Sequence, residues 1–452
     1  MSFSSKLFAL FVLGTATLFG QVGTQATITG SVSSSNGARV PDAVVTASNL
    51  ATGAVSRQQT GQDGEFTILA LPIGSYRVVV EAPGFKHWEN SEVTLTVGSR
   101  VRVEPVLEVG GATETVSVQS TSSAIQTESA TLDTVVQMDQ IRQLPLATRN
   151  PLALVGLVPG MNYQGTSNAA GMRITTVQGN GLRNDKTNFQ LDGVTSNDGS
   201  AEGGTAVPNV DSIAEFSVET INSGAEAGRS PSQVIVVTKG GTNSFHGSAF
   251  EFVQNDIFNA YNAFADKTKA KPRVRYNLFG GTLGGPVYRN KTFFFGSFQV
   301  TIIRNAQLLN EAAIPNAFIP TASGGADFSA WPTPIKDPVT GLPFANNQIP
   351  ASRIDSAAKY FLPILVTPNS TGNRYIANAK TYDKTYEYLG RVDHQITTNQ
   401  RIYGRYFYLQ EPTNQVGYRA DPSTYGLNTL RQHGLAVNYT WTLTPKTLAQ
   451  AL

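Results

Sequence analysis

The chain of 452 residues is long enough for two or three domains, and charged residues make up 15% of it. Ordinary soluble domains carry about 25%, so polarity here comes from Asn, Gln, Ser and Thr, as in β-rich proteins outside the cytoplasm. The net charge of +2 argues against a nucleic-acid-binding protein, and the absence of cysteine excludes disulfides, thiolate metal sites and cysteine nucleophiles.

Residues 1–21 have the features of a secretory signal peptide in the right order. Lys6 provides a positive charge, residues 7–19 form a short apolar core, and small residues surround Gly20. The alternative is a buried first strand. The core is shorter than the roughly 20 residues that a membrane-spanning helix needs, and no later segment of the sequence is long and apolar enough. Any membrane crossing would therefore require a β-barrel, in which all backbone groups are paired.

Residues 24–108 contain short apolar runs separated by turn signals. The predicted strands are 26–32, 43–49, 55–60, 65–69, 74–82, 92–97 and 100–107. The turn Gly61-Gln62-Asp63-Gly64 and Pro72 separate neighbouring runs. Seven short strands in a segment of this length predict an antiparallel β-sandwich.

The same segment resembles a known family in the order of its motifs. The matching residues are Ile28–Val32, Pro41–Val45, Thr60–Phe66, Leu71–Tyr76 and Ala82–Phe85. They are similar to the carboxypeptidase regulatory-like domain, a transthyretin-like sandwich that carries no peptidase chemistry. This class of fold is also described as carbohydrate-binding-like, so the resemblance implies that Tyr76, Phe85 and Trp88 could stack on a sugar. The alternative is that Tyr76 belongs to the core and Phe85 caps a sheet edge.

A short glycine-containing link leads to Glu114-Thr115-Val116-Ser117-Val118. This segment resembles a TonB box, which energised outer-membrane receptors offer to a TonB-type inner-membrane energy transducer. The physical basis would be strand addition, in which an extended peptide pairs with the edge of a partner sheet. The alternative is an ordinary first strand of the next domain.

Residues 109–241 predict a mixed domain of short helices and strands. The predicted elements are a helix over 138–144 ended by Pro145, a helical segment over 149–158 ended by Pro159, and a strand over 187–191 closed by the turn Asp192–Gly193. A strand over 234–237 consists of β-branched residues only and should be buried on both faces. The sequence Thr238-Lys239-Gly240-Gly241-Thr242 ends it.

This domain resembles the plug of TonB-dependent outer-membrane receptors, in their Oar-like branch. The stretches that carry the resemblance are IRQLPLATRNPLALVGLVPGM, GLRNDKTNFQLDGV and the end of the domain with Gly224, Gly228 and Val234–Gly241. The family's Tyr and one glycine are missing from this end. The resemblance implies an α+β plug in which Arg183 and Asp192 tie the plug together or to a barrel wall. Gly193, Lys239 and Gly240 are structural positions in the same motifs.

Alternative chemistry in this region has little support. Asp185, Asp192 and Asp198 could offer oxygens to a hard cation, but their spacing lacks the calcium-loop pattern and Asp-Gly forms turns. The four histidines are far apart, no HExxH or GxSxG motif occurs, and Gly179-Asn180-Gly181 lacks the third glycine of a dinucleotide loop. We therefore expect no enzyme, no cofactor and no metal site.

Residues 242–452 contain alternating strands rich in Tyr and Phe. The stretch NLFGGTLGGPVYRNKTFFFGSFQ resembles an early barrel hairpin of the Oar-like receptors. Residues 386–396, 402–408 and 435–443 alternate apolar and polar side chains, as in a lipid-facing barrel wall. The alternative is a soluble antiparallel sheet whose apolar face forms a core.

Residues 305–384 predict a long extracellular loop, because they are rich in Pro, Asn and Gly. The sequence then predicts about six strands and the start of another, 446–452. Plugged transporters have roughly 22 strands. We therefore expect the chain to be an N-terminal fragment or a truncated product.

The sequence as a whole predicts a mainly β protein. It should contain a signal peptide (1–21), a seven-stranded sandwich (24–108), a plug (109–241) and the first strands of a transmembrane barrel (242–452). The expected function is energised passage of a bulky solute, such as a carbohydrate or peptide, through a plugged barrel in outer-membrane lipid, with the N-terminal domain in the periplasm. The alternatives are a secreted or surface binding module that grips carbohydrate or peptide, and a peptidase, which has only a domain name in its favour.

Overall fold

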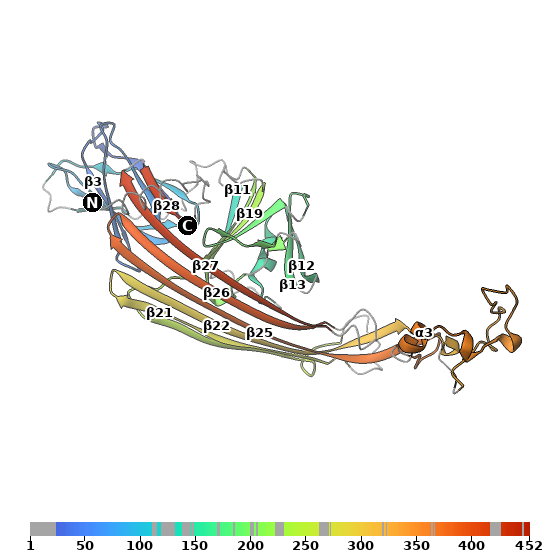
Figure 1. The fold of residues 1–452 in the computed structure, drawn as a ribbon. Coiled ribbons are helices and arrows are strands. Elements are labelled where there is room, and N and C mark those ends of the chain that lie inside the picture. The colour runs from blue at the N-terminus through green and yellow to red at the C-terminus, as the bar shows by residue number, and fades with distance from the viewer. Residues whose placement is uncertain are drawn as a thin grey trace, which may run out of the picture.

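The computed structural model describes most of the chain from Thr24 to Leu452. The described residues are 24–110, 115–118, 132–137, 146, 149–169, 172–183, 186–198, 203–204, 207–221, 230–261, 271, 273–318, 321, 323–362, 365, 367–415, 426–444 and 447–452. The predicted signal peptide, Glu114, Asp185, Gly224, Gly228 and the predicted helix over 138–144 lie outside them. Figure 1 shows an N-terminal β domain in blue, a middle domain in green and a large sheet of long strands from yellow to red.

The N-terminal domain is built from nine strands. They are β1 (Ala26–Ser31), β2 (Ser33–Ser34), β3 (Val44–Asn49), β4 (Val55–Gln59), β5 (Glu65–Leu71), β6 (Gly74–Glu81), β7 (His87–Leu95), β8 (Arg100–Val103) and β9 (Val106–Leu107). They form sheets of order β5-β1-β8 and β7-β6-β3-β4 and the pair β2-β9. Seven strands were predicted. The predicted run 100–107 is two strands, because Pro105 has no N–H for the ladder.

The core of this domain contains two of the three aromatic residues that were expected to stack on a sugar. Tyr76 is 2% exposed and its hydroxyl donates to the carbonyl of Pro72 at 2.9 Å, and Trp88 is 6% exposed. Phe85 is partly buried and packs against the same core. The alternative of a core position is therefore correct for Tyr76, and neither Tyr76 nor Trp88 presents a free ring face on which a sugar could stack.

In the described part of the middle domain, two sheets and short 3₁₀ helices pack around one core. Its strands are β11 (Leu132–Gln137), β12 (Met161–Ala169), β13 (Met172–Gly179), β14 (Thr187–Leu191), β15 (Val194–Thr195), β16 (Asn197–Asp198), β17 (Gly203–Gly204), β18 (Ile213–Ile221) and β19 (Ser232–Thr238). The sheets have the orders β11-β18-β19-β14-β15 and β12-β13-β17-β16. The predicted buried strand is confirmed, since all seven residues of β19 are buried.

The helical segment predicted after Arg149 begins at a capped turn. It is the 3₁₀ helix η1 (Pro151–Leu157), and the side chain of Asn150 caps it by accepting from the amide of Leu152. Pro151 fits the first helical position because it needs no amide partner there. A second 3₁₀ helix, η3 (Val210–Ser212), is capped by Asn209 and precedes β18.

Among the described residues, the large sheet has seven antiparallel strands in the order of the chain. They are β20 (His246–Asn255), β21 (Val274–Tyr288), β22 (Thr292–Ala312), β25 (Arg374–Thr397), β26 (Gln400–Gln415), β27 (Gly426–Thr444) and β28 (Thr447–Ala451). Each strand predicted in this region is present. The sheet is open, with β20 and β28 at its edges.

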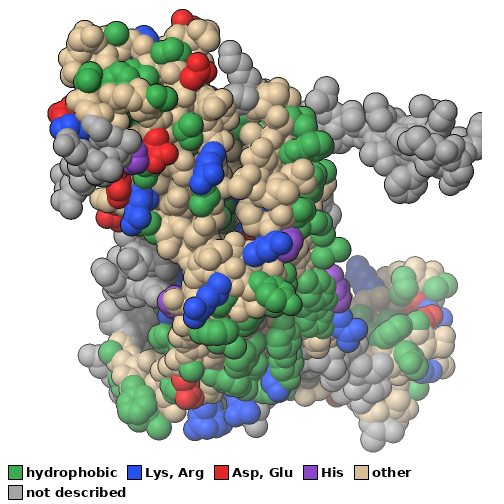
Figure 2. Space-filling model, turned by 90° about the vertical axis from the view of Figure 1, so that its left-hand side faces the viewer, with side chains coloured by type: hydrophobic (Ala, Val, Ile, Leu, Met, Phe, Trp, Pro, Cys, Tyr) green, Lys and Arg blue, Asp and Glu red, His purple; other side chains and the backbone are tan. Residues whose placement is uncertain are grey.

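The two faces of this sheet differ as the alternation predicts, and the apolar face is the exposed one. On it Tyr388, Val392 and Leu435 are 45%, 50% and 71% exposed. Figure 2 shows hydrophobic side chains gathered in a broad green patch. On the opposite face Glu387 and Arg405 are buried, because the middle domain covers them. The alternative of a soluble sheet with its core on the apolar face is therefore wrong.

The long loop predicted over residues 305–384 is shorter than expected at both ends. Strand β22 continues to Ala312 and β25 begins at Arg374, and the two pair along this whole extension. The prediction missed it because this part of the hairpin has no apolar alternation. Between the strands lie η5 (Asn316–Phe318), β23 (Ala326–Asp327), η6 (Ala345–Asn347), β24 (Gln348–Ile349), η7 (Ala351–Arg353) and α3 (Ser356–Phe361). Among the described residues, no helix has the length and apolarity to cross a membrane.

Candidate interface between the middle domain and the sheet wall

The turn after β14 brings a buried carboxylate to the inner face of the large sheet. Asp192 is 2% exposed and has φ 52°, and Gly193 follows with φ 84°. Such left-handed conformations suit Asp and Gly, which explains their place at this turn. The amide of Asp192 donates to the carbonyl of Val236 at 2.9 Å, which ties the turn to β19.

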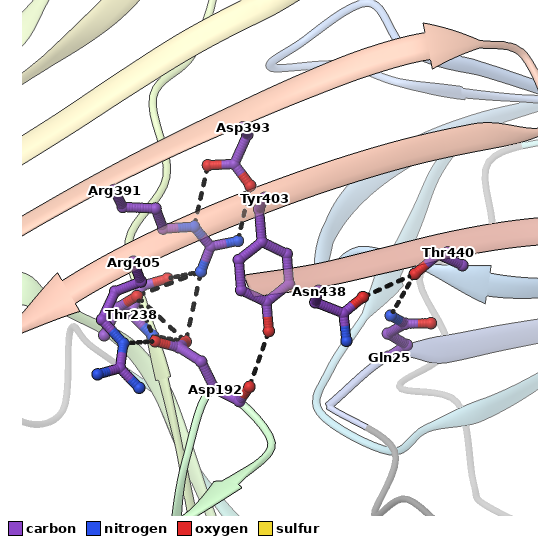
Figure 3. A network of polar contacts seen from close by, with 9 residues as sticks. All are labelled: Gln25, Asp192, Thr238, Arg391, Asp393, Tyr403, Arg405, Asn438 and Thr440. Carbon is purple, nitrogen blue, oxygen red and sulfur yellow. Dashed lines mark hydrogen bonds and ion pairs between the residues drawn. The ribbon is translucent and has the colours of Figure 1, made fainter. Parts of the chain in front are cut away.

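Both oxygens of the Asp192 carboxylate are occupied by donors from two domains (Figure 3). Within the middle domain, Thr238 donates its amide at 2.8 Å and its hydroxyl at 2.9 Å. From the sheet wall, Arg405 Nε lies 3.0 Å and Arg391 Nη1 lies 3.3 Å from the carboxylate. These oxygens are therefore not available to a metal ion, which removes Asp192 from the alternative cation site.

The two arginines are themselves fixed by further contacts on the wall. Arg391 makes a bidentate pair with Asp393, with Nε–Oδ2 at 2.9 Å and Nη2–Oδ1 at 2.8 Å. Its guanidinium carbon lies 4.5 Å from the ring centre of Tyr403, whose hydroxyl donates to the carbonyl of Asp192 at 2.7 Å. The carboxylates of Asp192 and Asp393 thus balance the guanidinium groups of Arg391 and Arg405. Buried charges are tolerated when they are paired in this way.

A second polar contact joins η3 to the wall. Glu387 on β25 accepts from the backbone amide of Asn209 at 2.5 Å and from its side chain at 2.6 Å. The Asn209 side chain also donates to Ser297 on β22 at 3.3 Å. Sequence reasoning missed these residues, because no local pattern shows that residues far apart along the chain will meet.

Arg149 provides a third contact at the start of η1. Its guanidinium pairs with Asp211 at 2.6 Å and lies 3.9 Å from the ring centre of Phe252 on β20. An arginine over an aromatic face is attracted by the ring quadrupole. The middle domain is therefore held to β20, β22, β25 and β26 by separate groups.

The N-terminal domain contacts both other parts of the chain. The amide of Val97 donates to the carboxylate of Glu215 on β18 at 2.8 Å, and Val97 packs with Ile235 and Val237. Asn243 donates to the carbonyl of Thr52 at 2.7 Å. A cavity of about 280 Å³ lies where the three parts meet, lined by residues that include Asn49, Asp192, Lys239, Arg391 and Arg401.

Of the other predicted plug positions, Lys239 and Gly240 lie in close contacts and Arg183 is exposed. Lys239 donates from Nζ to the carbonyl of Asp211 at 2.7 Å, so it holds η3 against the end of β19. A Cβ atom on Gly240 would lie 3.1 Å from Asp393 Oδ2, which explains a small residue there. Arg183 lies exposed on the loop between β13 and β14.

The segment that resembles a TonB box forms a strand. Strand β10 (Thr115–Val118) pairs in parallel with β7, with Thr115 opposite His87 and Val118 opposite Asn90. It therefore adds to the edge of the N-terminal domain's larger sheet, which becomes β10-β7-β6-β3-β4. The segment can make the backbone pairing that strand addition needs.

Two family profiles match this chain. Residues 27–108 match the carboxypeptidase regulatory-like domain, and residues 237–452 match an outer membrane beta barrel domain. The TonB-dependent transporter Oar of Myxococcus xanthus is 28% identical over 286 residues, which cover 58% of this chain and 25% of that protein. The chain thus spans about a quarter of the length of this relative.

Solved structures of lower similarity were also found. The ferric enterobactin receptor PfeA is 14% identical, with a TM-score of 0.38 over 68% of this chain and 38% of the receptor. The outer membrane transporter YddB of Escherichia coli is 10% identical, with a TM-score of 0.36 over 69% of this chain and 45% of the transporter.

Proposed function

We infer that this chain is an Oar-like TonB-dependent outer-membrane transporter, with a carboxypeptidase regulatory-like domain and an outer membrane β-barrel domain. The observation that carries the inference is the large sheet. Its apolar side chains face outward, and its polar inner face is covered by the middle domain through buried charge pairs. A lipid-facing wall around a plugged interior needs this arrangement.

In this proposal the middle domain is the plug, and the contacts of Asp192 keep it seated. Arg391 and Arg405 on the wall and Thr238 on the plug share one carboxylate, so a pull on the plug has to separate charges inside a buried interface. Breaking such a pair costs several kcal/mol. These contacts therefore keep the plug against the wall in the absence of force, and an external energy source is required to break them.

The energy source in this proposal is a TonB-type transducer that pairs with residues 114–118. The strand β10 supports this role, since it already uses an exposed sheet edge as a pairing partner. To reach the transducer the segment has to leave β7, which exchanges one set of backbone hydrogen bonds for another. The solute is a bulky molecule, for which we propose a carbohydrate or a peptide.

A matched pair of substitutions at Val116 tests the proposal. Val116→Pro removes the backbone N–H and should abolish uptake of labelled peptide and oligosaccharide mixtures into cells, while solute binding to isolated membranes remains. Val116→Thr keeps the backbone donor and the β-branched shape and should transport normally. A protonophore should stop uptake by the parent protein.

Two results would contradict the proposal, and each contradicts a different part of it. Normal uptake by Val116→Pro would show that this segment does not engage the transducer. Uptake that continues under the protonophore would show that transport is not energised.

A further inference from the structure

The outward face of the large sheet is uncharged near the short turns. Side chains of one parity share a face of a strand, and the exposed Phe279, Phe298, Val392 and Leu435 identify the outward set on β21, β22, β25 and β27. From the short turns upward, this set holds aromatic, aliphatic, small and amide side chains and His394 and His433. Between the short turns and the first charged residue of each of these four strands, the outward set contains no Lys, Arg, Asp or Glu.

The first charged residue on the outward face of each of these strands is basic. Each lies 12 or 13 residues from the end of its strand at the short turns. The four residues, here called the cationic row, are Arg275 on β21, Arg304 on β22, Lys384 on β25 and Arg431 on β27. Among the residues whose side chains the structure describes, strand β26 has no charged residue on this face, and Glu251 on the edge strand β20 is the exception in sign.

The nearly equal count of 12 or 13 residues along four strands gives the cationic row one height. Strands rise about 3.3 Å per residue and tilt by about 35–45° in a barrel, so 12 or 13 residues correspond to about 30 Å above the turns. The apolar band of an outer-membrane barrel is about 25 Å tall, and its short turns are periplasmic. The row therefore lies just beyond the apolar band, at the headgroup level of the outer leaflet.

Like charges meet within the cationic row without a described counter-charge. Arg275 and Arg304 are direct partners in the β21–β22 ladder, an arrangement that is destabilising by itself. None of the four forms an ion pair with an acidic residue in the described part of the chain. The buried Nε of Arg275 has no hydrogen-bond partner among those residues. An anion between these side chains would reduce the repulsion between Arg275 and Arg304 and would accept a hydrogen bond from the Nε of Arg275.

Aromatic rings hold two members of the row in place. The guanidinium carbon of Arg304 lies 5.5 Å from the ring centre of Tyr382, and Nζ of Lys384 lies 4.8 Å from that of Tyr386. Tyrosine favours the membrane–water interface because its ring is apolar and its hydroxyl is polar. The rings thus reduce the side-chain freedom that anion binding would otherwise have to remove.

We propose that the cationic row binds the phosphate groups of outer-leaflet lipid headgroups. The proposal rests on the sheet lying in the outer membrane. Guanidinium groups match phosphate by paired hydrogen bonds, and Lys adds a point charge. Arg275, Arg304 and Lys384 come from three consecutive strands, so one headgroup with more than one phosphate can contact all three. The row would fix the depth and rotation of the wall in the membrane.

The test compares two triple variants of the full chain by native mass spectrometry. The chain is titrated with bisphosphorylated lipid A, and with the same lipid after removal of its phosphates. Replacing Arg275, Arg304 and Lys384 by Gln should weaken binding of the phosphorylated lipid roughly 100-fold, at about fivefold per basic residue. The control replaces the exposed Arg289, Lys291 and Lys336 by Gln and removes the same charge; it should bind as the parent does.

Two results would overturn the proposal. One is equal affinity of the parent chain for the phosphorylated and dephosphorylated lipids, and the other is unchanged affinity in the first triple variant. Flotation with vesicles reports insertion of each variant separately, so a failure of the sheet to enter membranes is distinguished from a failure to bind lipid. If the triple variant does not insert, the single change Arg304→Gln should still weaken binding about fivefold, and unchanged affinity there also overturns the proposal.

Discussion

Asp192 shows how one side chain can join two domains. Its carboxylate is almost fully buried, and a buried charge without partners costs several kcal/mol. Here Thr238 on the middle domain and Arg391 and Arg405 on the wall satisfy both oxygens. The pairing is specific because it requires β14, β19, β25 and β26 to be in register at the same time.

The substitution Asp192→Asn tests this residue. It keeps the shape of the side chain but leaves two buried guanidinium groups facing one remaining carboxylate, that of Asp393. Breaking a buried ion pair from one side typically costs about 3–5 kcal/mol, so we expect the free energy of unfolding, measured by urea titration of the detergent-solubilised chain, to fall by that order.

The matched control is Asp63→Asn, an exposed residue in a turn of the N-terminal domain. It should change the free energy of unfolding by less than about 0.5 kcal/mol. Equal stability of Asp192→Asn and the parent would show that the charge pairs do not hold the domains together.

At the scale of elements, the chain enters the large sheet through a tight passage. Gly241 follows β19 and lies against the β21–β22 hairpin, where an added Cβ would lie 2.4 Å from the carbonyl oxygen of Phe294 and 2.7 Å from that of Gly285. These are backbone atoms of paired strands and cannot move independently. The absence of a side chain at Gly241 therefore allows the middle domain to lie close to the wall.

Gly241→Ala should destabilise the assembly of the middle domain with the hairpin. Overpacking of this kind costs about 1–3 kcal/mol, which a lower urea midpoint would report. Gly390→Ala is the control, because Gly390 is a strand glycine of the same sheet where an added Cβ would meet no atom within 4 Å beyond its chain neighbours. A midpoint for Gly241→Ala that matches the Gly390→Ala midpoint would contradict the close approach.

At the scale of the whole molecule, the N-terminal domain is joined to the middle domain at a buried acid. Burial raises the pKa of Glu215 to about 7 from an ordinary 4.5; the Val97 amide that donates to it opposes this rise, and the nearby Asp133 adds to it. The folded chain therefore keeps a proton between pH 4.5 and about 7 that the unfolded chain releases.

The stability that this proton contributes is fully present below pH 4.5 and is lost as the pH rises through about 7. We expect the parent chain to lose on the order of 3 kcal/mol more than Glu215→Gln between pH 4.5 and 8, because one pKa unit corresponds to about 1.4 kcal/mol. Thermal or urea unfolding of both proteins over this range measures the difference. If the free energy of unfolding changed with pH in the same way in both proteins, Glu215 would not be the group that causes the pH dependence.

Local patterns in the sequence predicted most of the elements. Alternation over residues 386–396 and 435–443 predicted both the strands and their two faces, because period 2 is a property of the strand itself. The β-branched run of β19 predicted its burial, and Asp-Gly predicted the turn at Asp192. The pairing of β22 with β25 beyond residue 305 was not predictable in this way, since neither strand keeps an apolar face there.

By itself the sequence determined which segments are strands, which side of each is apolar, and where turns and domain motifs lie, because these depend on neighbours along the chain. Only the tertiary structure decided that Tyr76 and Trp88 are core residues, that Arg391 and Arg405 meet Asp192, and that four basic residues share one height. Those facts depend on strand register and on contacts between residues far apart in sequence. A one-residue shift in register would turn the same side chains to the opposite face.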